Sequence, residues 1–333
     1  MKKTNILLAV LYCFFSTLVK SQTAQAPISD EFAHTYSIIA IDQKEGLMAV
    51  GVQSHWFNVG RIVPWAKAGV GVIATQSFAN TKLGYQGLTL LEENMHPEEV
   101  LSKLLTEDEG LDYRQFAILD AQGRISAFTG EKCIQHASHY IGENYSVQAN
   151  MMANDKVVPS MSLTFEERQD LPLPERVLEA LKSAQSAGGD IRGQQSVALI
   201  VVQISPNEAA KNKEHEIDLR VEDSQEPLHE LERLLKIHRG YELMNQADQA
   251  LEIEDYTTAL YLYNKAEDLM PNNIELQFWK SIAIISSGDE KKGVKSLKKV
   301  VKGNVNWQKL FLQLVKEGFL DVSEKVYQEI EHM

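Results

Sequence analysis

The chain has 333 residues, enough for about two domains and a substantial apolar core. Hydrophobic residues make up 44% and charged residues 24%, which is the balance of a folded globular protein and excludes a wholly disordered chain. The formal net charge is -13, so the surface as a whole repels a polyanion, and we expect no nucleic-acid partner.

The first residues predict an export signal. Lys2 and Lys3 precede an apolar run, 6–19, that is too short for a comfortable membrane span and suits the core of a signal peptide. Cleavage after Ser21 ends a signal peptide of residues 1–21 and leaves residues 22–33 as a polar, flexible lead-in. We therefore expect a periplasmic or secreted protein with no stable membrane insertion after signal cleavage. An uncleaved N-terminal anchor is the alternative.

The apolar pattern predicts a strand at 36–41 that pairs with a second strand at 47–53 through a turn. Apolar side chains occupy both faces of the first strand, which indicates a strand buried on both sides within a layered fold. Within the helical stretch 81–105, Pro97 marks the start of a second helix. Further strands are predicted at 70–76, 115–119, 124–128, 145–149, 195–204 and 216–221, and further helices at 154–167 and 174–187. Strand blocks that alternate with helix pairs favour an α+β fold of two packed sheets with helices outside.

The segment after about residue 228 is helical throughout by its periodicity, and it repeats. Ala259, Tyr263 and Ala266, closed by Pro271, match a tetratricopeptide unit of about 34 residues. The pattern returns one repeat later, at Gly293, Leu297 and Val300.

Two such units are fewer than the three or so that a free solenoid needs. We therefore expect this segment to pack on the first domain, on a helix at 307–331, or on another subunit. Repeats of this kind bind protein partners, and a homo-oligomer is also open. A generic helical bundle is the alternative.

The cysteines and histidines bear on disulfide bonds and metal binding. Cys13 would leave with the signal peptide, so Cys133 would have no disulfide partner in the mature chain. Cys133, His136 and His139 have spacings that could converge on zinc, but no fourth ligand lies nearby and no His-Glu-x-x-His motif occurs. We expect no metal and no other cofactor.

A standard Ser-His-Asp triad is not expected. Ser54 and His55 are adjacent, and neighbours on a strand point to opposite faces, so they are poorly placed as nucleophile and base. No Gly-x-Ser-x-Gly elbow occurs either.

Several blocks in order resemble one family, the bacterial domain-of-unknown-function family 1028, over about residues 34–238. The blocks are HTYSIIA (34–40), SHWFNVG (54–60), VPWA (63–66), GVG (69–71), ATQ (74–76), YSVQANM (145–151), AGGDIRGQQS (187–196) and the closing strand DLRVED (218–223). That family is grouped with N-terminal-nucleophile hydrolases, so the resemblance implies a four-layer αββα sandwich. Together with the helical repeats, this predicts two domains, a hydrolase-like domain at 34–238 from the resemblance and a tetratricopeptide-like domain at 239–333 from the repeat pattern.

The resemblance implies a mechanism by class. In such hydrolases the first residue of the processed chain attacks an amide carbonyl, and its own α-amine, with a pKa near ~8, acts as the base. Family members without a signal would expose the Thr that aligns with Thr35 after the initiator Met, so Thr35 is the implied nucleophile. Here signal cleavage leaves residues 22–34 in front of it, and a second cut after His34 is required. Without that cut Thr35 is an ordinary strand-entry residue, and Ser37 is a weaker substitute.

Residue type and position suggest further site residues. Thr75 and Gln76 close a glycine-flanked strand and could donate to an oxyanion. His55 could act as acid or base, or be a core histidine. Asn150 could donate a hydrogen bond at a strand end.

The glycine-rich segment 188–196 adds candidates for substrate binding. Asp190 and Arg192 could pair, or Arg192 could hold a substrate carboxylate through its two-pronged guanidinium. Gln195 and Ser196 open the strand that follows and complete this set. A purely structural turn is the alternative.

Two functions stay open, and a purely structural oligomer held by the repeats is a third and weaker option. The first is an exported amidohydrolase that cleaves a small amide or peptide bond; it predicts a mature chain beginning at Thr35. The second is a non-catalytic binding or scaffold protein that uses its helical repeats to dock a protein partner; it tolerates any start between Gln22 and Thr35.

Overall fold

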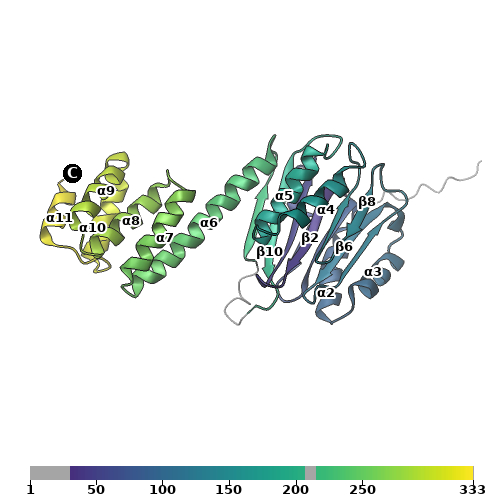
Figure 1. Cartoon of the computed structure of the whole chain (residues 1–333), viewed down its shortest axis with the longest axis horizontal. Helices are drawn as coiled ribbons and strands as arrows, with labels where there is room; N and C mark the ends of the chain where they lie inside the picture. The colour runs from purple at the N-terminus through teal and green to yellow at the C-terminus, as the bar shows by residue number, and fades with distance from the viewer. Residues whose placement is uncertain (1–30, 207–214, 333) are drawn as a thin grey trace, which may run out of the picture.

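The computed structural model describes residues 31–206 and 215–332. Two antiparallel β-sheets with helices on their outer faces form the first part, and the long helix α6 leads from them into a string of further helices (Figure 1). The predicted mixed α+β class and the helical C-terminal region are therefore confirmed. The expected signal peptide, 1–21, and residues 22–30 of the expected lead-in lie outside the described residues. Among the helices described, none has the length and apolarity to cross a membrane.

The larger sheet contains the strand that begins at Thr35. Its order is β11-β10-β3-β2-β9-β8, and every neighbouring pair is antiparallel. β2 (Thr35–Asp42) and β3 (Leu47–Ser54) form the predicted hairpin, with Thr35 opposite Ser54 at its open end. The other strands are β8 (Ser138–Ile141), β9 (Tyr145–Ala149), β10 (Ser196–Gln203) and β11 (Ile217–Val221).

The smaller sheet is built around β5 (Gly71–Ala79). On one side lie β6 (Arg114–Asp120) and then β7 (Ile125–Thr129). The opposite edge of β5 is shared by β4 (Pro64–Lys67), which pairs with its first half, and β1 (Glu31–Ala33), which pairs with its end. The sequence did not predict β1, β4 and β8, because strands of three or four residues are too short to show an alternation. Two 3-10 turns, Val59–Arg61 and Leu111–Tyr113, connect these elements.

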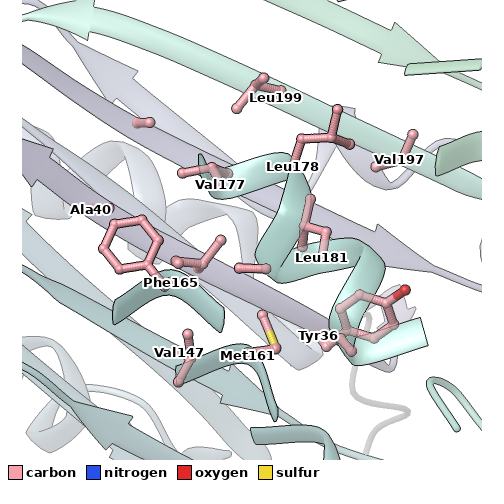
Figure 2. Close-up of a cluster of buried hydrophobic side chains, with 14 of the residues drawn as sticks. Tyr36, Ala40, Val147, Met161, Phe165, Val177, Leu178, Leu181, Val197 and Leu199 are labelled. Atoms are coloured by element: carbon pink, nitrogen blue, oxygen red, sulfur yellow. The ribbon is translucent and has the colours of Figure 1, made fainter. Parts of the chain in front are cut away.

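Both faces of β2 are buried in apolar packing, as predicted. Ile38 and Ala40 face α4 (Val157–Glu167) and α5 (Leu173–Ser186). Figure 2 shows Ala40 in this cluster with Val177 of α5. Ile39 and Ile41 face the smaller sheet and pack with its strands β5 and β6. The outer face of that sheet is covered by α2 (Thr81–Glu92) and α3 (Pro97–Thr106).

Helix α6 (Pro227–Glu252) connects the sheets to the helical region without a break. Its first half packs on the larger sheet through Leu228, Leu231 and Leu235. Its second half packs on α7 through Met244 and Ala247. The boundary expected between 238 and 239 thus falls inside one helix. At that level Arg239 donates to both carboxylate oxygens of Glu175 on α5, at 2.8 and 3.0 Å.

The remaining helices are α7 (Tyr256–Leu269), α8 (Ile274–Ser286), α9 (Glu290–Gly303), α10 (Val305–Lys316) and α11 (Glu324–Glu331). The single helix predicted at 307–331 is wrong. Gly318, with φ of 78°, ends the turn after α10, and Ser323 caps the start of α11 by accepting from the backbone N–H of Val326. The six repeat positions are all buried, namely Ala259, Tyr263, Ala266, Gly293, Leu297 and Val300.

Gly293 lets α8 and α9 approach closely, so a larger residue at this position should disturb their packing. A Cβ at Gly293 would lie 2.8 Å from the backbone nitrogen of Ile285 and 2.9 Å from the carbonyl oxygen of Ser281. We expect Gly293→Ala to destabilise the helical region by about 1 to 3 kcal/mol through overpacking, although Ala is favoured over Gly in a helix by about 1 kcal/mol. Gly303→Ala is the control in the same helix, because nothing lies within 4 Å of its Cβ position, and it should be neutral or stabilising. Urea unfolding followed by circular dichroism compares the two; equal stabilities would contradict the close-packing role.

Candidate active site

The space between the two sheets is apolar in one half and polar in the other. On β2 the side chains that face the other sheet are, in order, Thr35, Ser37, Ile39 and Ile41. Neighbouring strands change from apolar to polar at the same end, so the polar residues collect in one place. Besides Thr35 and Ser37, the polar half contains Ser54, Gln76, Gln115, Ser146, Gln148, Asn150 and Ser196, each at most 1% exposed.

Ser37, the three glutamines and Asn150 are joined by hydrogen bonds that cross from sheet to sheet. Ser37 Oγ donates to Gln76 Oε1 at 2.6 Å and accepts from Gln148 Nε2 at 2.6 Å. Gln76 Nε2 donates to Gln115 Oε1 at 2.7 Å, and Asn150 Nδ2 donates to the same oxygen at 2.9 Å. A buried network whose members satisfy one another holds its side chains in defined positions.

Thr35 lies fully buried at the edge of this network, as the first residue of β2. Its carbonyl oxygen accepts from the backbone N–H of Asn150 at 3.1 Å and from Gln76 Nε2 at 3.2 Å. The structure thus brings two predicted site residues, Gln76 and Asn150, to the predicted nucleophile.

The peptide bond between His34 and Thr35 has an unusual setting. The carbonyl oxygen of His34 accepts from Ser54 Oγ at 2.6 Å and from Arg192 Nη2 at 2.9 Å. Asp190, whose side chain is fully buried, holds Arg192 in turn, through Nε at 3.0 Å and Nη2 at 2.7 Å. A hydroxyl and a guanidinium on one carbonyl oxygen polarise the carbonyl and favour the negative charge that a nucleophilic attack would place there.

The His34 side chain is also held. Its Nδ1 hydrogen-bonds Asn150 Oδ1 at 2.9 Å, and its ring meets Phe78 edge-on with centroids 6.0 Å apart. The pKa of the imidazole lies below its ordinary value, chiefly because burial disfavours the charged ring; Asn150 raises the pKa and Arg192 lowers it. Burial therefore favours a neutral ring.

The expected role of Thr75 as a donor to an oxyanion does not fit the position of its side chain. Alternation along β5 turns its side chain to the face opposite Gln76, towards the cluster that contains Ile73 and is covered by α2 and α3. Thr75 Oγ1 is buried and hydrogen-bonds no group in the described part of the chain. Its hydroxyl therefore does not join the network.

Three other predicted residues lie beside the site and hold its loops. The backbone N–H of His55 donates to Asp190 Oδ2 at 3.2 Å. Gln195 Nε2 donates to Asp223 at 3.0 Å, and Ser196 Oγ donates to the carbonyl oxygen of Trp56 at 2.6 Å. These contacts position backbone segments around Arg192.

Sequence reasoning missed Ser54 as a donor to His34, and it missed Gln115 and Gln148 altogether. The available signal was the alternation of polar side chains at one end of successive strands. It could not be used without knowing which strand ends adjoin.

Two of the residues considered for zinc, Cys133 and His139, form hydrogen bonds within the protein. Cys133 Sγ donates to the carbonyl oxygen of Arg114 at 3.3 Å, and burial raises the pKa of its thiol. His139 Nδ1 hydrogen-bonds Thr129 Oγ1 at 2.8 Å. Within 31–206 and 215–332, no group of three or more His, Cys, Asp or Glu is arranged to hold a metal ion.

Comparison with known proteins gives a family and a related structure. Residues 35–231 match the model of a family of unknown function, DUF1028. The crystal structure of protein SPO2555 from Silicibacter pomeroyi, which carries the same family model, is similar with 27% sequence identity and a TM-score of 0.55. The similarity covers 61% of this chain and 85% of that chain. No curated protein matches the chain.

Proposed function

Because the chain belongs to the family of unknown function DUF1028, its activity has to be inferred from its own residues, and we propose that it is an exported amidohydrolase with Thr35 as an N-terminal nucleophile. The observation that carries the proposal is the carbonyl oxygen of His34, which accepts from Ser54 and Arg192 directly before Thr35. The substrate is an amide or peptide whose carbonyl takes the same position.

The chain frees the Thr35 amine by cutting itself after His34. The Thr35 hydroxyl oxygen attacks the His34 carbonyl carbon, the C–N bond breaks, and the hydroxyl proton ends on the Thr35 nitrogen. Water then hydrolyses the resulting ester to a His34 carboxylate and restores the Thr35 hydroxyl. Ser54 and Arg192 stabilise the oxyanion in both steps.

The processed enzyme repeats this chemistry on its substrate. The free amine of Thr35 accepts the hydroxyl proton as the oxygen attacks the substrate carbonyl, a role that suits α-amines because their ordinary pKa is about 8. The proton passes to the leaving amine, and water hydrolyses the ester. Asp190 is a positioning residue here, because it holds Arg192 against the reacting oxygen.

Three further observations support the proposal. The packing order of a helix pair, two sheets and a second helix pair fits the four-layer αββα sandwich of N-terminal-nucleophile hydrolases. Thr35 begins a strand at the interface of the two sheets. The match to the family model begins at Thr35.

A second candidate function has one observation in its favour. While the preceding residues are attached, Thr35 is 0% exposed, and a buried nucleophile reaches no substrate. If the cut after His34 does not occur, the protein is a non-catalytic binding protein. In either case we propose that α7 to α9 form a tetratricopeptide-like unit that docks a protein partner, supported by the buried repeat positions at 34-residue spacing.

The intact mass of the protein purified from its native cell envelope tests the function. The proposal expects a mass that begins at Thr35. A stable mass that begins at Gln22, in protein kept under conditions where it is folded, would overturn both the self-cleavage and the N-terminal nucleophile.

Acid should destabilise the uncut chain, which the variant Thr35→Ala preserves. The folded chain holds the pKa of His34 below the ordinary 6.5. Between the unfolded pKa and the lower folded pKa, the unfolded chain binds a proton on His34 that the folded chain does not. Stability is therefore lost as the pH falls through this range. Melting temperatures at pH 7.5 and 5.5 measure this loss. Adding His34→Gln, which cannot titrate, should make the loss smaller; an identical loss would contradict the role of His34.

A further inference from the structure

The residues just before Thr35 form a strand on the edge of the smaller sheet. β1 is antiparallel to the end of β5, with Ala33 opposite Ser77 and Glu31 opposite Ala79. β4 occupies the earlier part of the same edge. The chain then crosses to the larger sheet at His34 and enters β2.

Three sets of contacts hold this leader segment, Glu31–His34, in place. Its backbone pairs with β5, the carbonyl oxygen of its last residue is held by Ser54 and Arg192, and the last side chain lies between Asn150 and Phe78. Only 1% of His34 is exposed. The leader therefore lies in an extended binding site, formed by the β5 edge, Ser54, Arg192, Asn150 and Phe78, that ends at the proposed nucleophile.

A cut after His34 breaks the covalent link that keeps the leader in place. When the leader leaves, the backbone groups of β5 from Ser77 to Ala79 lose their partner on this edge. An unpaired strand edge readily accepts an extended peptide. Ser77, opposite Ala33, also has φ of 74°, a strained conformation for a residue other than glycine, and such strain is concentrated at ligand sites.

We propose that the β5 edge binds the substrate as an added strand, so that the substrate is an extended peptide cut on the carboxyl side of the residue that takes the place of His34. The cut rests on the proposed function, whereas the binding does not. A planar side chain that can hydrogen-bond Asn150 and meet the edge of Phe78 fits the final position. While the leader is attached, it occupies the β5 edge and so prevents the substrate from binding there.

Binding is tested on a chain that begins at residue 35 with Thr35→Ala, which cannot react. This chain is the processed form that the proposed function expects, and among the residues whose side chains the structure describes, the buried apolar clusters begin at Tyr36. The probe is a fluorescein-labelled peptide Glu-Phe-Ala-His with a free carboxylate, followed by fluorescence anisotropy. It should bind the shortened chain, and it should not bind the longer chain carrying Thr35→Ala, in which the leader still occupies the edge. Equal binding to both chains, or no binding to the shortened one, overturns the proposal.

Two methylated probes test the strand geometry. Successive backbone N–H groups of a strand point to opposite edges, so only one of the amides of the Phe and Ala residues can face β5. Methylation of that amide should weaken binding about tenfold, the cost of one lost hydrogen bond and a steric clash, while methylation of the other should change little. Equal effects of the two methylations would mean that the peptide does not bind as a strand.

Hydrolysis separates this proposal from the proposed function. The chain that begins at Thr35 is given Glu-Phe-Ala-His-aminomethylcoumarin and the single-residue amide His-aminomethylcoumarin. Peptide binding without hydrolysis of either compound supports the binding edge and counts against Thr35 as the nucleophile. Equal kcat/KM for the two compounds supports the nucleophile and overturns the binding edge. Higher kcat/KM for the peptide, reduced by Phe78→Ala, supports both.

Discussion

A full-length chain with Thr35→Ala should keep His34 attached, and its hydrolysis of peptide amides should fall by at least about 10³-fold, because the substitution removes the oxygen that attacks both carbonyls. Thr35→Ser keeps a hydroxyl and should still be cut, more slowly. Intact mass after incubation of the purified proteins reports the cut, and release of aminomethylcoumarin reports hydrolysis.

Ser37→Ala is the matched control for the Thr35 variant. It removes a buried hydroxyl two residues along the same strand but leaves both donors to the His34 carbonyl in place. This control should be less stable yet still processed. If the Thr35→Ala chain were cut at the same bond, self-cleavage by Thr35 would be wrong.

Asp108→Ala should lower the free energy of unfolding by about 3 kcal/mol, because it removes two charge-assisted hydrogen bonds from the buried guanidinium of Arg114. The two side chains are 7% and 4% exposed and joined by two hydrogen bonds, at 2.7 and 2.9 Å. Arg114 also donates to the carbonyl oxygen of Phe78, next to the proposed peptide-binding edge. We therefore expect the same variant to loosen the leader segment, seen as faster amide hydrogen exchange in β1.

The exposed pair of Lys67 and Glu92 is the control for the Asp108 variant. Its N–O distance is the same 2.7 Å, but the side chains are 48% and 54% exposed. Water screens such a pair, so Glu92→Ala should cost about 1 kcal/mol or less. Urea unfolding of both variants measures the difference; similar losses would show that burial does not set the strength of the Asp108 pair.

Much of the fold was predictable from local pattern. The hairpin of β2 and β3, the helix start at Pro97 and the two buried faces of β2 follow from alternations of two and of about 3.6 residues, which neighbours along the chain encode. The strands predicted in the first domain are all present, with ends that differ by a few residues. The helix predicted at 307–331 failed because a single glycine, Gly318, interrupts an otherwise helical pattern.

The candidate site was predictable only in part. Thr35, Gln76, Asn150, Asp190 and Arg192 were named from the sequence, but nothing in it placed Arg192 on the carbonyl oxygen of His34.

The sequence alone determined which residues form strands and helices and which side chains share a face, because these depend on spacings of a few residues. Only the tertiary structure decided which faces and which strand ends meet. Ser54, His34 and Arg192 are brought together by the register of β2 on β3 and by the loop that follows α5. The packing of the smaller sheet puts the Gln76 face of β5 against the larger sheet and so turns Thr75 away from the network. Contacts between residues 20 to 158 positions apart depend on the simultaneous packing of all the elements between them, and no local pattern encodes that.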